Sequence, residues 1–102
     1  MINGEVGQMY YDMNEENLAF EYFSTLNIDE LLNNPDITLA RLNAVADTFY
    51  KKNRLDNALK LYTYIYEKYP DDSSANTAIF RSASIPNFPI NHILVCFKIA
   101  KI

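Results

Sequence analysis

The chain has 102 residues, which is the size of one small domain. Its 49% hydrophobic and 22% charged residues exclude an intrinsically disordered or collagen-like chain. A single cysteine and a single histidine exclude a disulfide scaffold and argue against a metal-dependent hydrolase.

The charge is divided unevenly along the chain. Residues 1–40 carry eight acidic side chains and no Lys or Arg, whereas residues 41–102 carry nine basic and five acidic ones, so the two parts have net charges of −8 and +4. The acidic part repels phosphate, and the basic residues that follow are scattered rather than clustered. Nucleic acid is therefore not an expected partner.

No targeting segment is visible in the sequence. The N-terminus lacks the basic flank and apolar run of a signal peptide. The longest apolar stretch, residues 90–102, is too short and too often interrupted by polar residues to span a bilayer. We expect an intracellular protein, cytoplasmic or nuclear, that has no membrane partner.

The predicted elements begin with a pair of helices. Apolar and aromatic residues at helical spacing predict a first helix around Val6–Tyr10, a polar turn at residues 12–16 and a second helix that opens at Leu18 and Ala19. Extra residues before Pro35 are expected to lengthen this second helix or the turn at residues 32–36.

A second pair follows the same plan. Leu42, Val45, Ala46 and Phe49 have helical spacing, residues 51–54 form a polar turn, and apolar spacing resumes from Leu55 to Tyr66. Pro70 is expected to end this helix.

The two pairs are similar to each other at a separation of 39 residues. The matched positions are Val6 and Val45, Gly7 and Ala46, Tyr10 and Phe49, Ala19 and Ala58, Phe23 and Tyr62, and Leu26 and Ile65. The small residues of this set (Gly7, Ala19, Ala46 and Ala58) are predicted to lie where paired helices cross, because a larger side chain would separate the axes. The chain therefore contains an internal repeat.

This pattern resembles the tetratricopeptide repeat (TPR) family. The second repeat, residues 39–72, carries the residues of the family pattern, from Leu42 to Pro70, but has Ile65 where a small residue is usual. The first repeat, residues 1–36, is clipped at its start and lengthened, and has Leu31 in place of the expected proline. The resemblance implies an all-α fold of helix-turn-helix repeats in a solenoid, with two repeats and a divergent C-terminal segment.

The C-terminal segment, residues 73–102, departs from the pattern. Ser73–Ala83 is predicted to be the first helix of a third repeat, with Ala78, Ile79 and Ala83 facing inward. Beyond it the family pattern is lost, and residues 90–102 are apolar on every side, which fits a buried helix or a strand equally. The segment is a divergent third repeat, a cap or a tail foreign to the array.

The chain shows no arrangement of residues that indicates catalysis. His92 and Cys96 are four residues apart, but no third group is present to orient them for nucleophilic chemistry, and both are expected among apolar neighbours. There is no glycine-rich phosphate loop and no nucleophile elbow. We expect no enzyme, no catalytic residue, no metal, no cofactor and no small-molecule substrate.

The TPR resemblance implies a binding groove lined by the first helix of each repeat. Carried over by position, the groove residues are Gln8, Tyr11, Asp12, Asn43, Asp47, Tyr50, Lys51 and, on a third helix, Arg81. A clamp for a C-terminal carboxylate is not expected, because Gly4 and Gln8 stand where such a clamp has Lys and Asn.

The expected function is a non-catalytic protein-protein interaction scaffold that acts within a multi-subunit complex. Its partners would be other proteins, namely subunits of that larger assembly. One alternative is an adaptor that binds an extended peptide in the groove, and another is a truncated fragment without independent activity. The scaffold hypothesis is an inference from fold resemblance.

Overall fold

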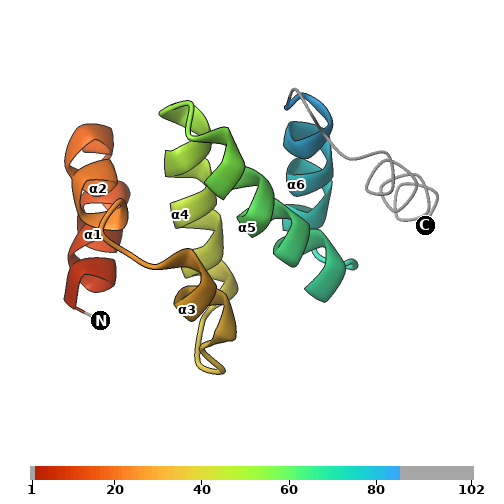
Figure 1. Ribbon diagram of the computed structural model, residues 1–102, viewed down its shortest axis with the longest axis horizontal. Coiled ribbons are helices and arrows are strands. Elements are labelled where there is room, and N and C mark those ends of the chain that lie inside the picture. Colours follow the sequence, from red (N-terminus) through yellow and green to blue (C-terminus); the bar gives the residue numbers. More distant parts are fainter. Residues whose placement is uncertain (1, 86–102) are drawn as a thin grey trace. The chain divides into compact units, whose positions relative to one another are not determined.

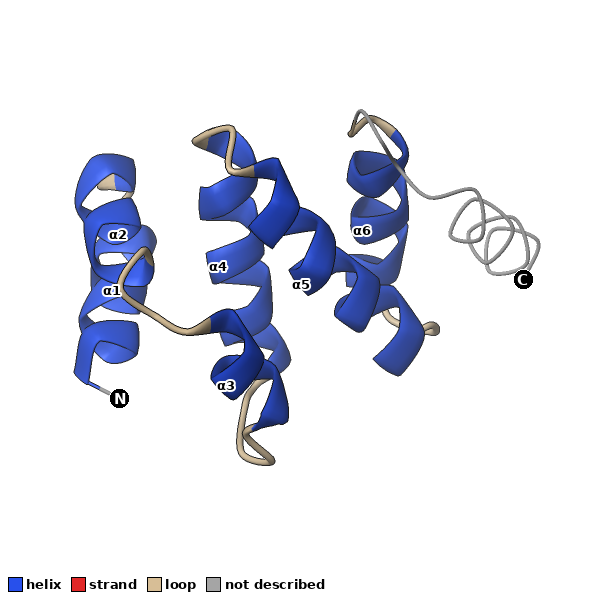
Figure 2. Ribbon diagram, viewed as in Figure 1, coloured by secondary structure: helices blue, strands red, loops and turns tan. Residues whose placement is uncertain are grey.

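The computed structural model describes residues 2–85 of the chain. Within this part the chain forms α-helices and no β-strand (Figure 1, Figure 2), as the sequence predicts. The chain divides between Leu61 and Tyr62 into two compact units, which are described separately.

The helices of the first unit come in the order that the hydrophobic spacing predicts, with one addition. They are α1 (Ile2–Asp12), α2 (Glu16–Phe23), α3 (Ile28–Asn33), α4 (Leu39–Lys51) and the first half of α5 (Leu55–Lys68). Helix α1 packs beside α2, and α4 contacts both of them (Figure 1). The first unit is thus built on a helical pair to which α4 is added.

The packing of α1 on α2 depends on a glycine. The ring of Phe23 lies directly over Gly7, so that a Cβ atom at position 7 would be 2.5 Å from Cε1 of that ring. Beside this contact, the rings of Tyr10 and Tyr22 stack with their centroids 5.6 Å apart. Ala19, Ala46 and Ala58 are completely buried. All four small residues therefore lie inside the protein. At position 7, the Phe23 ring leaves no space for a Cβ atom, which explains the glycine.

Helix α4 joins the pair through aromatic side chains. The rings of Phe20 on α2 and Phe49 on α4 meet edge to face at 5.9 Å, and the guanidinium of Arg54 lies 5.5 Å from the Phe20 centroid. Helix α4 begins at Thr38, whose side chain accepts a hydrogen bond from the Arg41 backbone N–H.

The residues that were expected to lengthen the second helix or the turn at residues 32–36 instead include a separate helix, α3. Ser24 and Thr25 donate side-chain hydrogen bonds to the carbonyls of Glu21 and Tyr22, which competes with continuation of the helix. The Asn27 side chain then accepts from the Glu30 N–H and starts the six-residue α3. The chain therefore turns at residues 24–27, where a continuous helix was one of the two predicted arrangements.

The second unit contains the rest of α5 and α6 (Ser73–Ala83), whose bounds are those the sequence predicts. Tyr62, Ile65 and Tyr66 are buried, as are Ala75 and Ala78 on α6. The expected inward position of Ala83 is wrong, since Ala83 is exposed and Ser82 takes the buried place one residue earlier. The predictions for residues 86–102, those for His92 and Cys96 included, concern positions outside the described residues.

Candidate interaction face

Seven of the eight groove residues predicted from the sequence lie on or beside two helices of the first unit. Gln8, Tyr11 and Asp12 belong to α1, and Asn43, Asp47, Tyr50 and Lys51 belong to α4. Asp12 and Lys51 are exposed, and the other five are half-buried. We call these seven residues the α1/α4 face.

A hydrogen bond between a tyrosine and a carboxylate connects the two helices of this face. The Tyr11 hydroxyl donates to Asp47 Oδ2 at 2.9 Å, in a half-buried position. The same carboxylate oxygen lies 3.3 Å from Lys51 Nζ, one helical turn further along α4. Asp47 is therefore held by one residue of each helix.

Lys51 extends this network to α2. Its ammonium group donates to Glu16 Oε1 at 3.1 Å. These hydrogen bonds to Glu16 and Asp47, together with the negative charge of Asp47, raise the pKa of Lys51 above its ordinary value of 10.5. The ammonium form is thus favoured in the folded protein.

Gln8 forms the second polar link between α1 and α4. Its amide Nε2 donates to Asp12 Oδ1 at 3.0 Å, while its Oε1 accepts from Arg41 Nε at 3.1 Å. Both polar ends of the Gln8 side chain are therefore bonded within the face.

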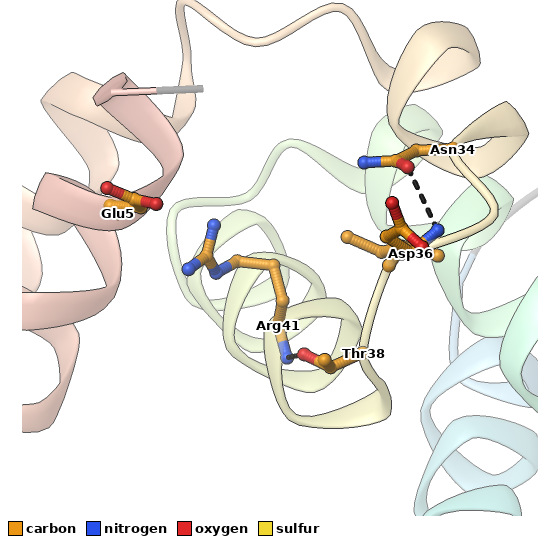
Figure 3. Close-up of a pocket in the computed structure, with 6 residues that line it drawn as sticks. Glu5, Asn34, Asp36, Thr38 and Arg41 are labelled. Atoms are coloured by element: carbon orange, nitrogen blue, oxygen red, sulfur yellow. Dashed lines mark hydrogen bonds between the residues drawn. The ribbon is translucent and has the colours of Figure 1, made fainter.

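A small pocket adjoins this second link (Figure 3). It has a volume of about 160 Å³ and is lined by Glu5, Asn34, Asp36, Ile37, Thr38 and Arg41. Figure 3 shows the Arg41 side chain reaching from α4 toward Glu5 on α1. On the other side, the Asp36 N–H donates to Asn34 Oδ1 at 2.9 Å and holds the loop before α4. Two carboxylates and one guanidinium give the pocket a mixed charge that suits a polar peptide group better than a phosphate.

The eighth predicted residue, Arg81, belongs to the second unit. Its Nη1 donates to the Tyr62 hydroxyl at 2.7 Å, and its guanidinium carbon lies 6.0 Å from the centre of the Tyr62 ring. A hollow of about 300 Å³ beside it is lined by Asn76, Thr77, Phe80 and Arg81. The structure therefore brings seven predicted residues together in one unit and gives Arg81 a different setting.

Sequence reasoning did not identify Glu16 and Arg41 as members of this network. Glu16 and Lys51 are 35 residues apart, and Gln8 and Arg41 are 33 apart, so no local spacing connects the partners. These pairs form only when the helices that carry them pack together in the folded unit.

Three exposed apolar side chains of the first unit have no role predicted from the sequence. Met9 and Met13 are 50% and 60% exposed, and Leu18 is 36% exposed. Met13 follows the last residue of α1, and its N–H donates to the Met9 carbonyl, while Leu18 lies in the first turn of α2. We call these three residues the α1–α2 apolar group.

Within residues 2–85, no group of three or more His, Cys, Asp or Glu side chains is placed to bind a metal ion. Over the same residues, each helix is too short or too polar to cross a membrane. Comparisons of the chain with known protein families, with curated proteins and with solved structures gave no match.

Proposed function

We propose that the chain is a non-catalytic, TPR-like interaction scaffold that acts within a multi-protein assembly. The observation that carries the proposal is a contrast between two surfaces of the first unit. Polar side chains of the α1/α4 face bond to one another, whereas the α1–α2 apolar group is left exposed. Burial of exposed apolar side chains against another protein removes hydrocarbon from water and so favours binding.

The two inter-helix turns support the assignment to a repeat family. Asn14 and Asn53, 39 residues apart, both have left-handed backbones, with φ of 63° and 62°. Glu15 N–H donates to the Tyr10 carbonyl, and Arg54 N–H donates to the Phe49 carbonyl in the same way. The same turn geometry therefore accompanies the same sequence pattern twice, which favours two copies of one helix-turn-helix unit.

The state of Asp47 favours a scaffold over a groove adaptor. A peptide group that took a place on Asp47 Oδ2 that is now filled would displace the Tyr11 hydroxyl or the Lys51 ammonium. Exchange of one hydrogen bond for another adds little net free energy, about 1 kcal/mol or less. The α1–α2 apolar group involves no such exchange, because its burial removes hydrocarbon from water.

Peptide capture is the second candidate function, and the pocket beside Arg41 is the observation that favours it. This pocket adjoins the α1/α4 face and presents a guanidinium and two carboxylates to a ligand. An extended peptide could place one polar side chain there while it follows α4.

The native assembly in the cells that make this protein distinguishes the two functions. The tagged full chain is expressed, and its apparent size in a native lysate is compared for wild type, Leu18→Glu and Tyr50→Ala. A scaffold is expected to migrate with a larger assembly, to be released from it by Leu18→Glu, and to be retained by it in Tyr50→Ala. Release by Tyr50→Ala alone would favour peptide capture.

Circular dichroism of each purified variant serves as the control for folding. Leu18 is on the surface, and Tyr50 is half-buried at the end of α4, so both variants are expected to keep the helical content of the wild type. A wild-type chain that migrates alone under all conditions would contradict the scaffold proposal.

A further inference from the structure

The α1–α2 pair of the first unit is packed on one side only. Figure 1 shows α4 on one side of the pair, where it contacts both helices. Gln8 and Tyr11 of α1 bond to side chains of α4, and Phe20 of α2 meets an aromatic ring of α4. Side chains that point away from these three therefore lie on the opposite side of the pair.

The stacked rings of Tyr10 and Tyr22 lie on that opposite side. Successive residues of an α-helix turn by about 100°, so Tyr10 is about 160° from Gln8 around α1, and Tyr22 is about 160° from Phe20 around α2. Both tyrosines are half-buried, and their ring centroids are 5.6 Å apart. One tyrosine from each helix thus forms the centre of this surface.

Exposed apolar side chains continue the surface toward the turn that connects the helices. Residue numbers that rise along α1 meet numbers that fall along α2, so the helices run antiparallel. Met13 is one turn beyond Tyr10, and its N–H donates to the Met9 carbonyl as in a helix, while Leu18 is one turn before Tyr22. Met13 and Leu18 therefore lie beside each other beyond the stacked rings, and Met9 lies one turn before Met13.

We call these five residues the outer face. It consists of the stacked tyrosines and the α1–α2 apolar group, whose three members are between 36% and 60% exposed. Transfer of these side chains from water to a partner surface would be favourable.

The charges around the outer face are all negative. Residues 2–23 carry five acidic side chains and no Lys or Arg, and all five are exposed. They are Glu5, Asp12, Glu15, Glu16 and Glu21. Lys51 pairs with Glu16, and no ion pair among residues 2–61 neutralises the other four. Glu15 and Glu21 are one turn before and one turn after Leu18, so negative charge borders the apolar surface directly.

We infer that the outer face binds a basic amphipathic helix of a partner protein, that is, a helix whose apolar stripe is bordered by lysine or arginine. The inference rests on the proposed scaffold function and names the chemistry of its partner. The apolar stripe would pack on Met9, Met13 and Leu18, and the bordering cations would face the carboxylates. A helix fits because the grooves between side chains of a helical pair accept the ridges of another helix. The flexible methionines adapt to partner side chains of different shape.

The negative charge of the pair argues against other occupants of the outer face. In a two-fold dimer of this chain the outer face would meet its own copy, and the unneutralised carboxylates of the two copies would repel each other. Nucleic acids and anionic membranes carry phosphate and are repelled for the same reason. The charge therefore selects a cationic partner.

Binding of two synthetic peptides to the purified full chain tests the inference. Both peptides are helices of about five turns with a leucine stripe, and their polar positions are lysine in one and glutamate in the other. A fluorescein label on the peptide allows the Kd to be measured by fluorescence anisotropy. We expect the lysine peptide to bind at least about tenfold more tightly than the glutamate peptide at low salt. Equal affinities, or no binding of the lysine peptide, would overturn the inference.

Two variants separate docking on the apolar surface from attraction between charges alone. Leu18→Glu and Met13→Glu remove apolar surface and add negative charge. Docking on the outer face predicts that each weakens binding of the lysine peptide at least about fivefold, whereas attraction between charges alone predicts tighter binding. Phe80→Glu makes the same kind of change at an exposed position of the second unit, and should leave the Kd unchanged. Unchanged or tighter binding in Leu18→Glu and Met13→Glu would show that the inference is wrong.

A further variant tests the carboxylates. The double variant Glu15→Gln/Glu21→Gln keeps the size of both side chains and is expected to weaken binding of the lysine peptide about threefold. Glu67→Gln, at an exposed position of α5, is the matched control and should have no effect. If the double variant binds like the wild type, the carboxylates do not select the partner and the inference fails. Circular dichroism verifies that each variant keeps its helical content.

These results can be distinguished from those of the native-lysate experiment. An assembly that Leu18→Glu releases, together with no binding of the lysine peptide, would retain the scaffold and overturn the basic partner. Selective binding of the lysine peptide by a chain that migrates alone in the lysate would support the inference and contradict the scaffold. Analytical ultracentrifugation of the purified chain covers one more occupant. A dimer that Leu18→Glu dissociates would place a second copy on the outer face and overturn the inference.

Discussion

Gly7 shows how one residue determines the distance between two helices. Phe23 is completely buried, so its ring has no space into which it can withdraw from a side chain at position 7. Glycine in the middle of a helix costs about 1 kcal/mol relative to alanine, and here the close packing of an aromatic ring offsets that cost.

We expect Gly7→Val to lower the free energy of unfolding by about 2–3 kcal/mol, because the added carbons would overlap the Phe23 ring and force overpacking. Urea denaturation followed by circular dichroism measures this loss. Ala40→Val adds similar carbons at an exposed position of α4 and should cost only about 0.5 kcal/mol. Equal losses in the two variants would show that the contact with Phe23 is not the cause.

Lys51 shows how one ammonium group connects the charges of two helices. Hydrogen bonds to Glu16 and Asp47 raise its pKa, so the folded state holds this proton more tightly than the unfolded state. The resulting stabilisation is complete below pH 10.5 and is lost as the pH rises through the higher pKa of the folded state. The side chain is 46% exposed, so the effect is modest and weakens with salt.

Above pH 10.5, we expect the free energy of unfolding to fall with pH in both proteins. The fall should be larger in the wild type than in Lys51→Met. Urea midpoints measured from pH 8 to pH 11.5, about one unit beyond the ordinary lysine value, provide the test. The two proteins differ at position 51 alone, so the difference between the two curves isolates Lys51. Lys51→Arg stays charged throughout and should lose less than the wild type. If the urea midpoints of wild type and Lys51→Met change with pH in parallel, the hydrogen bonds of Lys51 do not contribute to stability.

At the scale of the element, the two turns with left-handed asparagines determine where one helix stops and the next begins. Asn tolerates a positive φ better than most residues. For most other residues with a Cβ atom, this backbone conformation costs about 1–2 kcal/mol. In each turn, the N–H of the residue after the asparagine also donates a hydrogen bond to the preceding helix. Glu15 donates to the Tyr10 carbonyl, and Arg54 donates to the Phe49 carbonyl.

Asn53→Ala is therefore expected to lower the melting temperature by about 4–8 °C, the equivalent of about 1 kcal/mol in a domain of this size. Asn53→Gly adopts a positive φ at no steric cost and should change the melting temperature little. Thermal unfolding followed by circular dichroism compares the two variants. If both lose the same amount, the Asn53 side chain matters and its backbone conformation does not.

The sequence predicted some elements accurately and missed others for identifiable reasons. The predicted bounds of α6 agree with the structure, in which the Asp72 side chain caps the helix by accepting from the Ser74 N–H. Helix α3 was not predicted, because the break before it comes from hydrogen bonds of Ser24 and Thr25 to the backbone, and serine and threonine also occur within helices. Ala83 was predicted to face inward and is exposed. Alanine is small enough to occur on the buried or the exposed face of a helix, so its identity does not decide its position.

At the scale of the whole molecule, the sequence predicted the helical class and the helices that carry the candidate face. The seven residues of the α1/α4 face lie on two predicted helices, but the sequence did not indicate which of them bond to each other. The link from Tyr11 to Asp47 depends on side-chain directions in the packed structure, 36 residues apart along the chain. The exposure of Met9 and Phe80 was also unpredictable, since apolar residues at helical spacing are usually buried.

The stacked pair of Tyr10 and Tyr22 has a spectroscopic consequence. The chain contains no tryptophan, so tyrosine and phenylalanine rings account for its aromatic absorption. Two phenol rings held 5.6 Å apart at an interplanar angle of 20° form a fixed asymmetric environment for the electronic transitions of both. Near-ultraviolet circular dichroism depends on such fixed packing and vanishes when it loosens. The pairing of α1 with α2 thus contributes to the near-ultraviolet signal of the folded chain without an attached dye.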